Sequence, residues 1–428
     1  MTSSPPTSGL TTRTLDNGLR VVVRTDRSAP AVALNIWYDV GSRHEDLGRT
    51  GLAHLFEHLM FEGSQNVASG EHFGLLDASG ADLNATTWFE RTNYFETLPT
   101  GALDLALWLE ADRMTGLLAG LTQQNLDNQR DVVKNERRER YDNQPYGTVW
   151  ERLHQLAFPA DSPYHHDTIG SMEHLDAASL AECADFYRRH YRPSNAVLTL
   201  VGDVSTADAL ASVERYFGHL GADPAPPQPE PEHLGPLTAP LRLDLHEDVP
   251  APAVYALWRV ARDGTPEADA VDLALQILAG GTAARLGLRL VHGDELARGV
   301  SPFFLRQARG DSSAALIVEG RIGIDPAVLE QHLDEELWTF AAEGPTEEEL
   351  ARALASAERE WLDGTADFGG RADQYSRFAC LHGDAALADG VVARLRAVTP
   401  EQVRRAAAGL LPEQCARVVY HTDRSAHV

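Results

Sequence analysis

The sequence has few cysteines and no long apolar run. Its three cysteines, Cys183, Cys380 and Cys415, are far apart and form no C-x-x-C pair, so we expect no disulfide framework. No stretch approaches the roughly 20 apolar residues that span a bilayer. The first residues lack the basic start and apolar core of a secretory signal. These absences predict a cytoplasmic protein without a membrane segment.

Positive charge is also scarce. The 428 residues contain 37 Lys and Arg against 63 Asp and Glu, a formal net charge of −26. Proteins that bind a phosphate backbone carry a basic surface, so we expect no nucleic-acid partner. Hydrophobic residues make up 43% and charged residues 23% of the chain, which is typical of globular proteins and excludes a disordered chain.

A proline-rich segment divides the chain nearly in half. Residues 222–240, ADPAPPQPEPEHLGPLTAP, favour an extended connector. We therefore predict an N-terminal domain of residues 1–221, a linker of residues 222–240 and a C-terminal domain of residues 241–428. The alternative is one long surface loop inside a single domain, but structureless loops of more than about 12–15 residues are uncommon in compact domains.

Both halves open with strand-like runs and then pass into helical ones. This similar order indicates an internal duplication. It predicts an α+β fold of two homologous layered domains, each a mostly antiparallel sheet with helices packed on one face. The strand-like runs are 19–24, 31–40, 195–201, 254–260 and 314–322, and the helical runs are 50–62, 103–118 and 268–278.

The segment His54-Leu55-Phe56-Glu57-His58 carries the clearest chemical signal. On a helix, His54 and His58 project from one face and can reach a single metal ion. Glu57 leans over the same face, where it can take a proton from a water activated by the metal. This is the inverted H-x-x-E-H motif of zinc peptidases. The alternative is an amphipathic helix with ordinary surface histidines.

A catalytic zinc usually takes three protein ligands plus water. A long helix predicted over residues 122–143 offers Asp131, Glu136 and Glu139 as candidate carboxylates. Spacing alone does not choose among them, and each could instead form a solvated ion pair with a neighbouring arginine.

Five segments together resemble the pitrilysin/insulinase family of zinc peptidases, in the branch that is similar to mitochondrial processing peptidase. They occur in the order GLAHLFEHLMFEGS, ADLNATTWFERTNYFETLP, VVKNERRERYDN, SPYHHDTIG and YRPSNAVLTLVGDV. The resemblance implies that His54 and His58 bind zinc, that Glu57 is the general base and that Glu136 is the third ligand.

The resemblance also implies roles for residues around the metal. Family members often have a glutamate seven residues before the carboxylate ligand, where it orients a zinc histidine; here that position is Gln129, which can accept a hydrogen bond but brings no charge. Asn84 and Ala85, in a strand-like run over residues 81–87, match the family's substrate-binding edge strand, to which an extended peptide adds by β-augmentation.

The second half departs from the family pattern. Relatives commonly carry an Arg and a Tyr there that grip the substrate backbone and help to stabilise the tetrahedral intermediate, whereas this chain has Val291 and Arg298 at those places. Arg285 and Arg289 lie nearby in the sequence. We interpret them as residues of a solvated helix face rather than as a replacement for the missing pair. The missing pair suggests a homologous second subunit that supplies it, with a heterodimer favoured over a homodimer.

The sequence therefore predicts a zinc metalloendopeptidase that cleaves short or unfolded peptides in an enclosed chamber. One alternative is a non-catalytic scaffold subunit of a processing-peptidase-like complex, but such members usually lose part of the zinc motif. A second alternative is a metal-dependent hydrolase of small molecules, which the peptide-binding signature around Asn84 disfavours.

Overall fold

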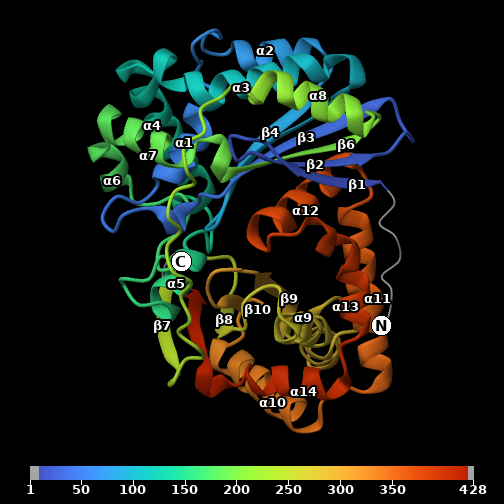
Figure 1. The fold of residues 1–428 in the computed structure, drawn as a ribbon. Helices are drawn as coiled ribbons and strands as arrows, with labels where there is room; N and C mark the ends of the chain where they lie inside the picture. Colours follow the sequence, from blue (N-terminus) through green and yellow to red (C-terminus); the bar gives the residue numbers. More distant parts are fainter. Residues whose placement is uncertain (1–8, 423–428) are drawn as a thin grey trace. The chain divides into compact units, whose positions relative to one another are not determined.

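The computed structural model describes residues 9–422, which divide into two compact units. Within the described residues, unit 1 comprises 9–135, 167–229 and 362–390, and unit 2 comprises 136–166, 230–361 and 391–422. Each unit contains one sheet and its helices (Figure 1). The units are described in turn.

Unit 1 is built on a six-stranded sheet. The strands, in the order in which they lie side by side, are β1 (Leu10–Thr14), β2 (Arg20–Thr25), β6 (Ala196–Gly202), β3 (Ala31–Tyr38), β5 (Thr92–Pro99) and β4 (Asp82–Thr87). Strands β2 and β6 are parallel, and all other neighbours in this sheet are antiparallel. Strand β4 therefore ends the sheet among the described strands.

Helices cover both faces of this sheet. Helices α1 (Leu52–Leu59), α3 (Leu103–Gly120) and α8 (Thr206–Phe217) lie on one face, and α12 (Phe368–Leu381) lies on the other (Figure 1). Because side chains alternate along a strand, the Tyr94 hydroxyl reaches the Phe56 carbonyl on α1, while the Asn93 amide reaches Asp373 on α12. The remaining helices of unit 1 are α2 (Glu71–Ala78), α4 (Gln123–Arg137), α6 (Met172–Ala177) and α7 (Leu180–His190).

Unit 2 is built on a five-stranded sheet. Its strands, in spatial order, are β7 (Leu241–Glu247), β11 (Ala416–Thr422), β8 (Ala253–Val260), β10 (Ser312–Gly320) and β9 (Ala297–Leu305). Strands β7 and β11 are parallel and the others antiparallel. This sheet repeats the order of β2, β6, β3, β5 and β4, so the predicted duplication is visible in the topology.

The second sheet is also covered on both faces. Helix α5 (Val149–Ala157) packs its Trp150 ring 4.2 Å from the Phe303 ring of β9, between ring centroids, while α9 (Pro266–Ala279) and α10 (Pro326–Glu343) contact the sheet through its other face. The other helices of unit 2 are α11 (Glu347–Gly364), α13 (Val391–Arg396) and α14 (Pro400–Ala408).

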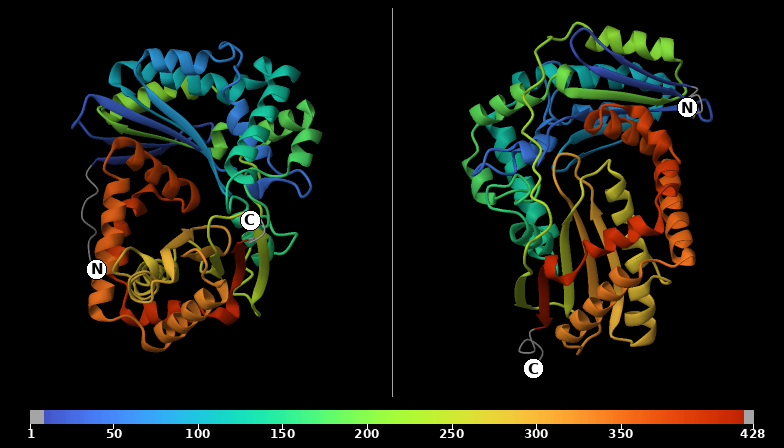
Figure 2. Two further views of the ribbon diagram at one scale, coloured as in Figure 1. Left: turned by 180° about the vertical axis from the view of Figure 1, so that it is seen from behind. Right: turned by 60° about the horizontal axis from the view of Figure 1, so that its bottom comes forward.

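One helix on each sheet comes from the other half of the sequence. Helix α12 follows all strands of the second sheet except β11, yet it packs on β3 and β6 of unit 1. Helix α5 lies in the first half and packs on β8 and β11 of unit 2. Figure 2 shows α12, in orange, against the blue strands of the first sheet. The compact units therefore differ from the sequence halves by an exchange of helical segments.

The predicted fold class, two α+β layered domains with related sheets, is confirmed. The sequence predicts helices on one face of each sheet, and the structure adds the exchanged helix on the other face. Residues 222–231 contain no helix or strand, and Glu232 forms an isolated β-bridge with Gly310. The domain limits 1–221 and 241–428 stay a prediction, because they describe halves of the sequence rather than compact units.

Candidate metal centre

Helix α1 carries the H-x-x-E-H motif, and a carboxylate fixes its start. Gly51 precedes the helix with φ +96°, and a Cβ atom there would lie 2.8 Å from the Ile169 carbonyl oxygen, so the position requires glycine. The Glu45 carboxylate accepts hydrogen bonds from the Gly51 and Ala53 amides, at 2.9 and 2.7 Å. A negative charge at this end stabilises the helix through its dipole.

The apolar residues of α1 face the core and leave the motif on the other side. Leu52, Leu55, Phe56 and Leu59 are buried. Neither imidazole of the motif is fully exposed, and the His54 and His58 rings lie 4.9 Å apart between centroids, with an interplanar angle of 85°. The spacing of four residues therefore brings the two rings together, as the sequence predicts.

Helix α4 brings a carboxylate to the same place. Glu136, its penultimate residue, is partly buried, whereas Asp131 and Glu139 are exposed. The Glu136 carboxylate also forms an ion pair with the Arg140 guanidinium, with 2.6 Å between oxygen and nitrogen, but the Arg140 side chain is 73% exposed. A pair of this kind contributes little, so it does not prevent Glu136 from binding a metal.

His54, His58 and Glu136 form one candidate metal-binding group. Each offers one ligand atom, and these atoms all lie within 4.8 Å of one another. Around a tetrahedral zinc, ligand atoms at bond lengths of about 2.0–2.2 Å would be about 3.4 Å apart. Two imidazoles and one carboxylate are a ligand set of catalytic zinc. The group therefore fits zinc after small movements of the side chains.

Glu57 is partly buried, and its charge acts on the Arg91 guanidinium. Burial lowers the pKa of Arg91 to about 10, and the charges of Asp373 and Glu57 oppose that shift. Arg91 donates to the Thr86 carbonyl oxygen at 2.7 Å and lies 5.2 Å from the Trp37 ring centroid. Arg91 could not be found from the sequence, because Trp37, Glu57 and Asp373 come to it from three distant segments.

Gln129 contacts a carboxylate that follows α1. Its amide nitrogen donates to Oε1 of Glu62, and Oε2 of Glu62 accepts from Asn125 at 2.6 Å and from Ser69 at 2.9 Å. The resemblance to the family implies a contact of Gln129 with a zinc histidine, whereas in the structure Gln129 contacts Glu62. The signal was available, since Glu62 lies four residues after His58, the spacing that joins the two histidines.

Asn84 and Ala85 lie on the edge strand β4, with Asn84 exposed and Ala85 buried. The Trp88 amide bonds to the Arg91 carbonyl at the end of the hairpin. Because hydrogen-bonded pairs alternate in antiparallel strands, the backbone groups of Ala85 point to the free edge. The Ala85 amide donates to Oδ1 of Asn84 at 2.8 Å.

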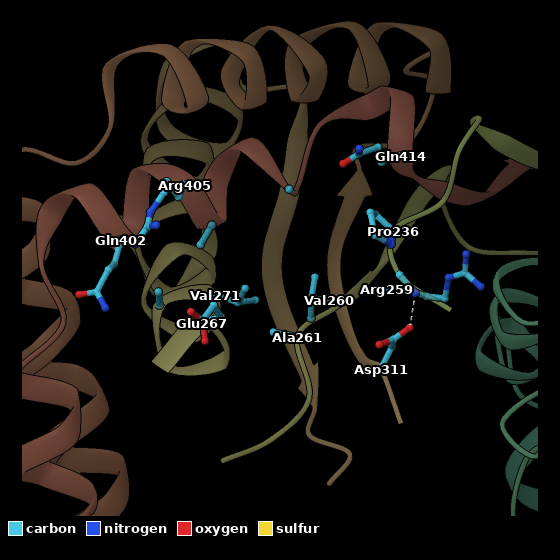
Figure 3. A pocket seen from close by; sticks show the side chains of 14 residues that line it. Pro236, Arg259, Val260, Ala261, Glu267, Val271, Asp311, Gln402, Arg405 and Gln414 are labelled. Atoms are coloured by element: carbon cyan, nitrogen blue, oxygen red, sulfur yellow. Dashed lines mark hydrogen bonds between the residues drawn. The ribbon is translucent and has the colours of Figure 1, made fainter. Parts of the chain in front are cut away.

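Each unit has a cavity away from the ligand group. In unit 1 a cavity of about 730 Å³ lies between β4, β5 and the start of α12, lined by Asp82, Phe95 and Phe368 among others. In unit 2 a cavity of about 420 Å³ lies beside α9 and α14 (Figure 3). It is lined by no histidine, and its Asp311 accepts a 2.7 Å hydrogen bond from the Gly235 amide. Neither lining includes His54, His58 or Glu136.

The arginines named in the second half are held by acidic partners. Arg285 bonds to Glu349 at 2.7 Å, Arg298 bonds to Glu319 at 3.0 Å, and Arg289 pairs with Glu335. Val291 lies in a π-helical turn, Gly287–Gly293. In the described part of the chain, no helix is long and apolar enough to cross a membrane.

Comparison with known proteins places this site in a family. Residues 20–165 match the model "Insulinase (Peptidase family M16)", and residues 177–357 match "Peptidase M16 inactive domain". The zinc protease PqqE of Helicobacter pylori is 34% identical over 237 residues, 54% of this chain and 53% of that protein. A probable mitochondrial-processing peptidase subunit beta of Arabidopsis thaliana is 28% identical over 49% of this chain and 39% of that protein.

The chain thus matches about half or less of the length of these curated relatives. A crystal structure of a protease from Helicobacter pylori superposes with a TM-score of 0.89 at 25% identity, covering 96% of this chain and 99% of that one. The resemblance found in the sequence is confirmed. The chain belongs to the insulinase family of peptidases, family M16.

Proposed function

We propose that the protein is a zinc-dependent endopeptidase that cleaves short or unfolded peptides. The observation that carries the proposal is the convergence of His54, His58 and Glu136, with their ligand atoms within 4.8 Å. Further support comes from Glu57, which lies between the two histidines on α1. A relative named a zinc protease is 34% identical over half of the chain.

The residues of α1 and α4 have two roles, which are metal binding and proton transfer. His54, His58 and Glu136 would hold zinc, which when bound polarises a scissile carbonyl and acidifies water. Glu57 accepts a proton from the attacking water and returns it to the nitrogen of the leaving amine. Its place at i+3 from His54 keeps its carboxylate on the metal-facing side of the helix.

The edge strand β4 is proposed to bind the peptide as an added strand. The Asn84 oxygen is held by the Ala85 amide, which leaves the amide nitrogen of the exposed Asn84 side chain to donate to a peptide carbonyl. The 730 Å³ cavity reaches Asp82 at the start of β4, so it offers room for peptide side chains that point to the α12 face.

The proposal includes a second, homologous subunit, with a heterodimer favoured. Its support is the place of Val291 and Arg298 where an Arg and Tyr pair was expected, and the ion pairs that hold Arg285 and Arg289. A relative is itself named a peptidase subunit. Purification of the chain alone and with a homologous chain tests this: cleavage that rises only with the second chain supports a heterodimer, and equal rates contradict it. The cytoplasmic location and the enclosed chamber stay predictions.

The decisive experiment is Glu57→Gln in the zinc-loaded protein. Loss of a general base should lower the rate of cleavage of an unstructured fluorogenic peptide by about 100-fold or more, while the zinc content stays at that of the parent. Glu173→Gln, which changes an exposed glutamate on α6, is the control and should change neither value. Undiminished cleavage by Glu57→Gln would remove Glu57 from its role. A parent protein that cleaves no peptide either alone or with the homologous chain would favour a scaffold subunit.

A further inference from the structure

Two polar rows join α1 to α4. Helix α1 contributes His54 and His58, and the turn after it contributes Glu62. That turn continues the helical path, because the Glu62 amide donates to the Leu59 carbonyl at 3.0 Å. The three side chains are therefore spaced by four residues along one face.

The facing row lies on α4 and runs the opposite way. Asn125, Gln129 and Glu136 are all partly buried, and offsets of four and seven residues place them within about 40° of one another around the helix. Asn125 and Gln129 meet Glu62, whereas Glu136 joins the two histidines.

The lengths of the two rows match. At about 1.5 Å per residue, Gln129 and Glu136 are about 10 Å apart along α4. Glu62 lies about 6 Å from His58 and about 12 Å from His54 along α1, so the midpoint of the histidines is about 9 Å away. A contact of Gln129 with Glu62 therefore sets the register that brings Glu136 level with the imidazoles.

We infer that Glu62 is a positioning residue, and that through Gln129 and Asn125 it holds α4 in the register that zinc binding needs. The inference rests on the proposed function and deepens it. Glu62 is suited to this role because its carboxylate accepts from both α4 amides and from the Ser69 hydroxyl. Hydrogen bonds to a charged acceptor are stronger than those between neutral groups.

The inference gives Gln129 a different role from the one expected by resemblance to the family. If Gln129 acts directly on a zinc histidine, Gln129→Glu should add charge and strengthen zinc binding. If it acts through Glu62, the same change sets two carboxylates against each other and pushes the helices apart. The one substitution therefore gives opposite results under the two hypotheses.

The experiment measures the zinc dissociation constant of the full chain by competition with a chromophoric chelator. We expect Gln129→Glu to weaken zinc binding about 10- to 100-fold, the usual effect of losing a residue that supports a ligand. The double variant Glu62→Gln with Gln129→Glu exchanges the two groups and keeps one amide facing one carboxylate. It should return the dissociation constant to within about threefold of the parent, because the hydrogen bond is restored.

A matched control and a second measurement keep the test specific. Gln124→Glu adds the same charge to an exposed position of α4, where the Gln124 side chain bonds to Asn128 of the same helix, and should leave zinc binding unchanged. Amide hydrogen exchange of α4 in the metal-free protein should be faster in Gln129→Glu and normal in the double variant.

Unchanged or tighter zinc binding by Gln129→Glu would overturn the inference, and so would a double variant as weak as the single one. A parent chain that binds no zinc would instead refute the proposed function. The exchange measurement would then decide the inference by itself, since it reports the contact between α4 and Glu62 without metal.

Discussion

Five strands of the first sheet have the same order as the five strands of the second. The helix that follows the central strand of this order has different side chains in the two sheets. Helix α1 follows β3 in the first sheet, and α9 follows β8 in the second. The side of α1 that faces away from the core carries two imidazoles and a carboxylate, all partly buried. Helix α9 instead carries Asp269 and Asp272, which pair with Arg306 at 3.4 and 2.7 Å. A cation of the chain itself thus neutralises the carboxylates of the second unit.

The comparison shows that a shared backbone does not by itself make a metal site. Each unit even has a close pair of histidines. His246 and His421 of unit 2 stack 4.5 Å apart with an interplanar angle of 19°, and His421 bonds to Asp244 at 2.7 Å. In the described part of the chain, only the group with His54 and His58 gathers three ligand atoms. A remote carboxylate, Glu136, is what distinguishes the pair of His54 and His58 from the pair of His246 and His421.

The largest effect is expected from breaking the metal-binding pair. His58→Ala should lower the zinc content from about one ion per chain to nearly none, since two ligands do not hold a catalytic zinc. His421→Ala removes an imidazole from the pair in unit 2 and should leave the zinc content unchanged. Elemental analysis after gel filtration measures both. Full zinc content in His58→Ala would place the site elsewhere.

The next effect concerns buried charge in unit 1. The Arg113 guanidinium, 2% exposed, donates to the fully buried Glu110 at 3.0 Å. Arg113→Met leaves that carboxylate buried without its cation and should lower the free energy of unfolding by about 3–5 kcal/mol. Arg13→Met breaks an exposed pair with Glu214 and should cost less than about 1 kcal/mol. Urea unfolding measures the difference, and equal costs would show that Glu110 is neutral.

The same cluster gives unit 1 a pH dependence. Burial raises the pKa of Glu96 and of Glu110, and the charge of Arg113 only partly opposes it. Carboxyl groups with raised pKa values stabilise the fold at low pH, and this stability is lost as the pH rises through those values. Glu96→Gln should therefore gain stability relative to the parent as the pH rises above the ordinary pKa of a glutamate, about 4.3. The free energy of unfolding is measured against pH for both proteins, and a difference between them that does not change with pH would contradict this.

The periodicity of the sequence predicted the local elements because each depends on neighbouring residues. The strand-like run AVALNIWY forms β3 in the structure. The residues Leu52, Leu55, Phe56 and Leu59, which have helical spacing, lie on α1. The exchange of α12 and α5 was not predicted, since it depends on which distant segment covers a second sheet face. One sign was present: β3 is apolar at nearly every position, which is typical of a strand covered on both faces.

The candidate site shows the same limit. Spacing along one helix predicted His54 and His58, but it could not choose among Asp131, Glu136 and Glu139, because the choice depends on which face of α4 turns inward. Burial of Leu126 and Val133 marks that face in the structure. The contact of Gln129 with Glu62 could not be predicted for the same reason, because it joins residues 67 positions apart in the sequence.

The smallest effect is expected at the edge strands, where the two sheets again correspond. Asn84→Asp on β4 keeps the oxygen that binds the Ala85 amide but removes the donor proposed to hold a peptide carbonyl. Loss of one hydrogen bond of about 0.5–1.5 kcal/mol should lower kcat/KM about two- to tenfold, through KM. Ser301→Asp puts the same charge on the exposed edge strand β9 and should leave peptide cleavage unchanged. If both variants lose activity equally, net charge rather than the β4 edge governs peptide binding, and the two edges do not differ in function.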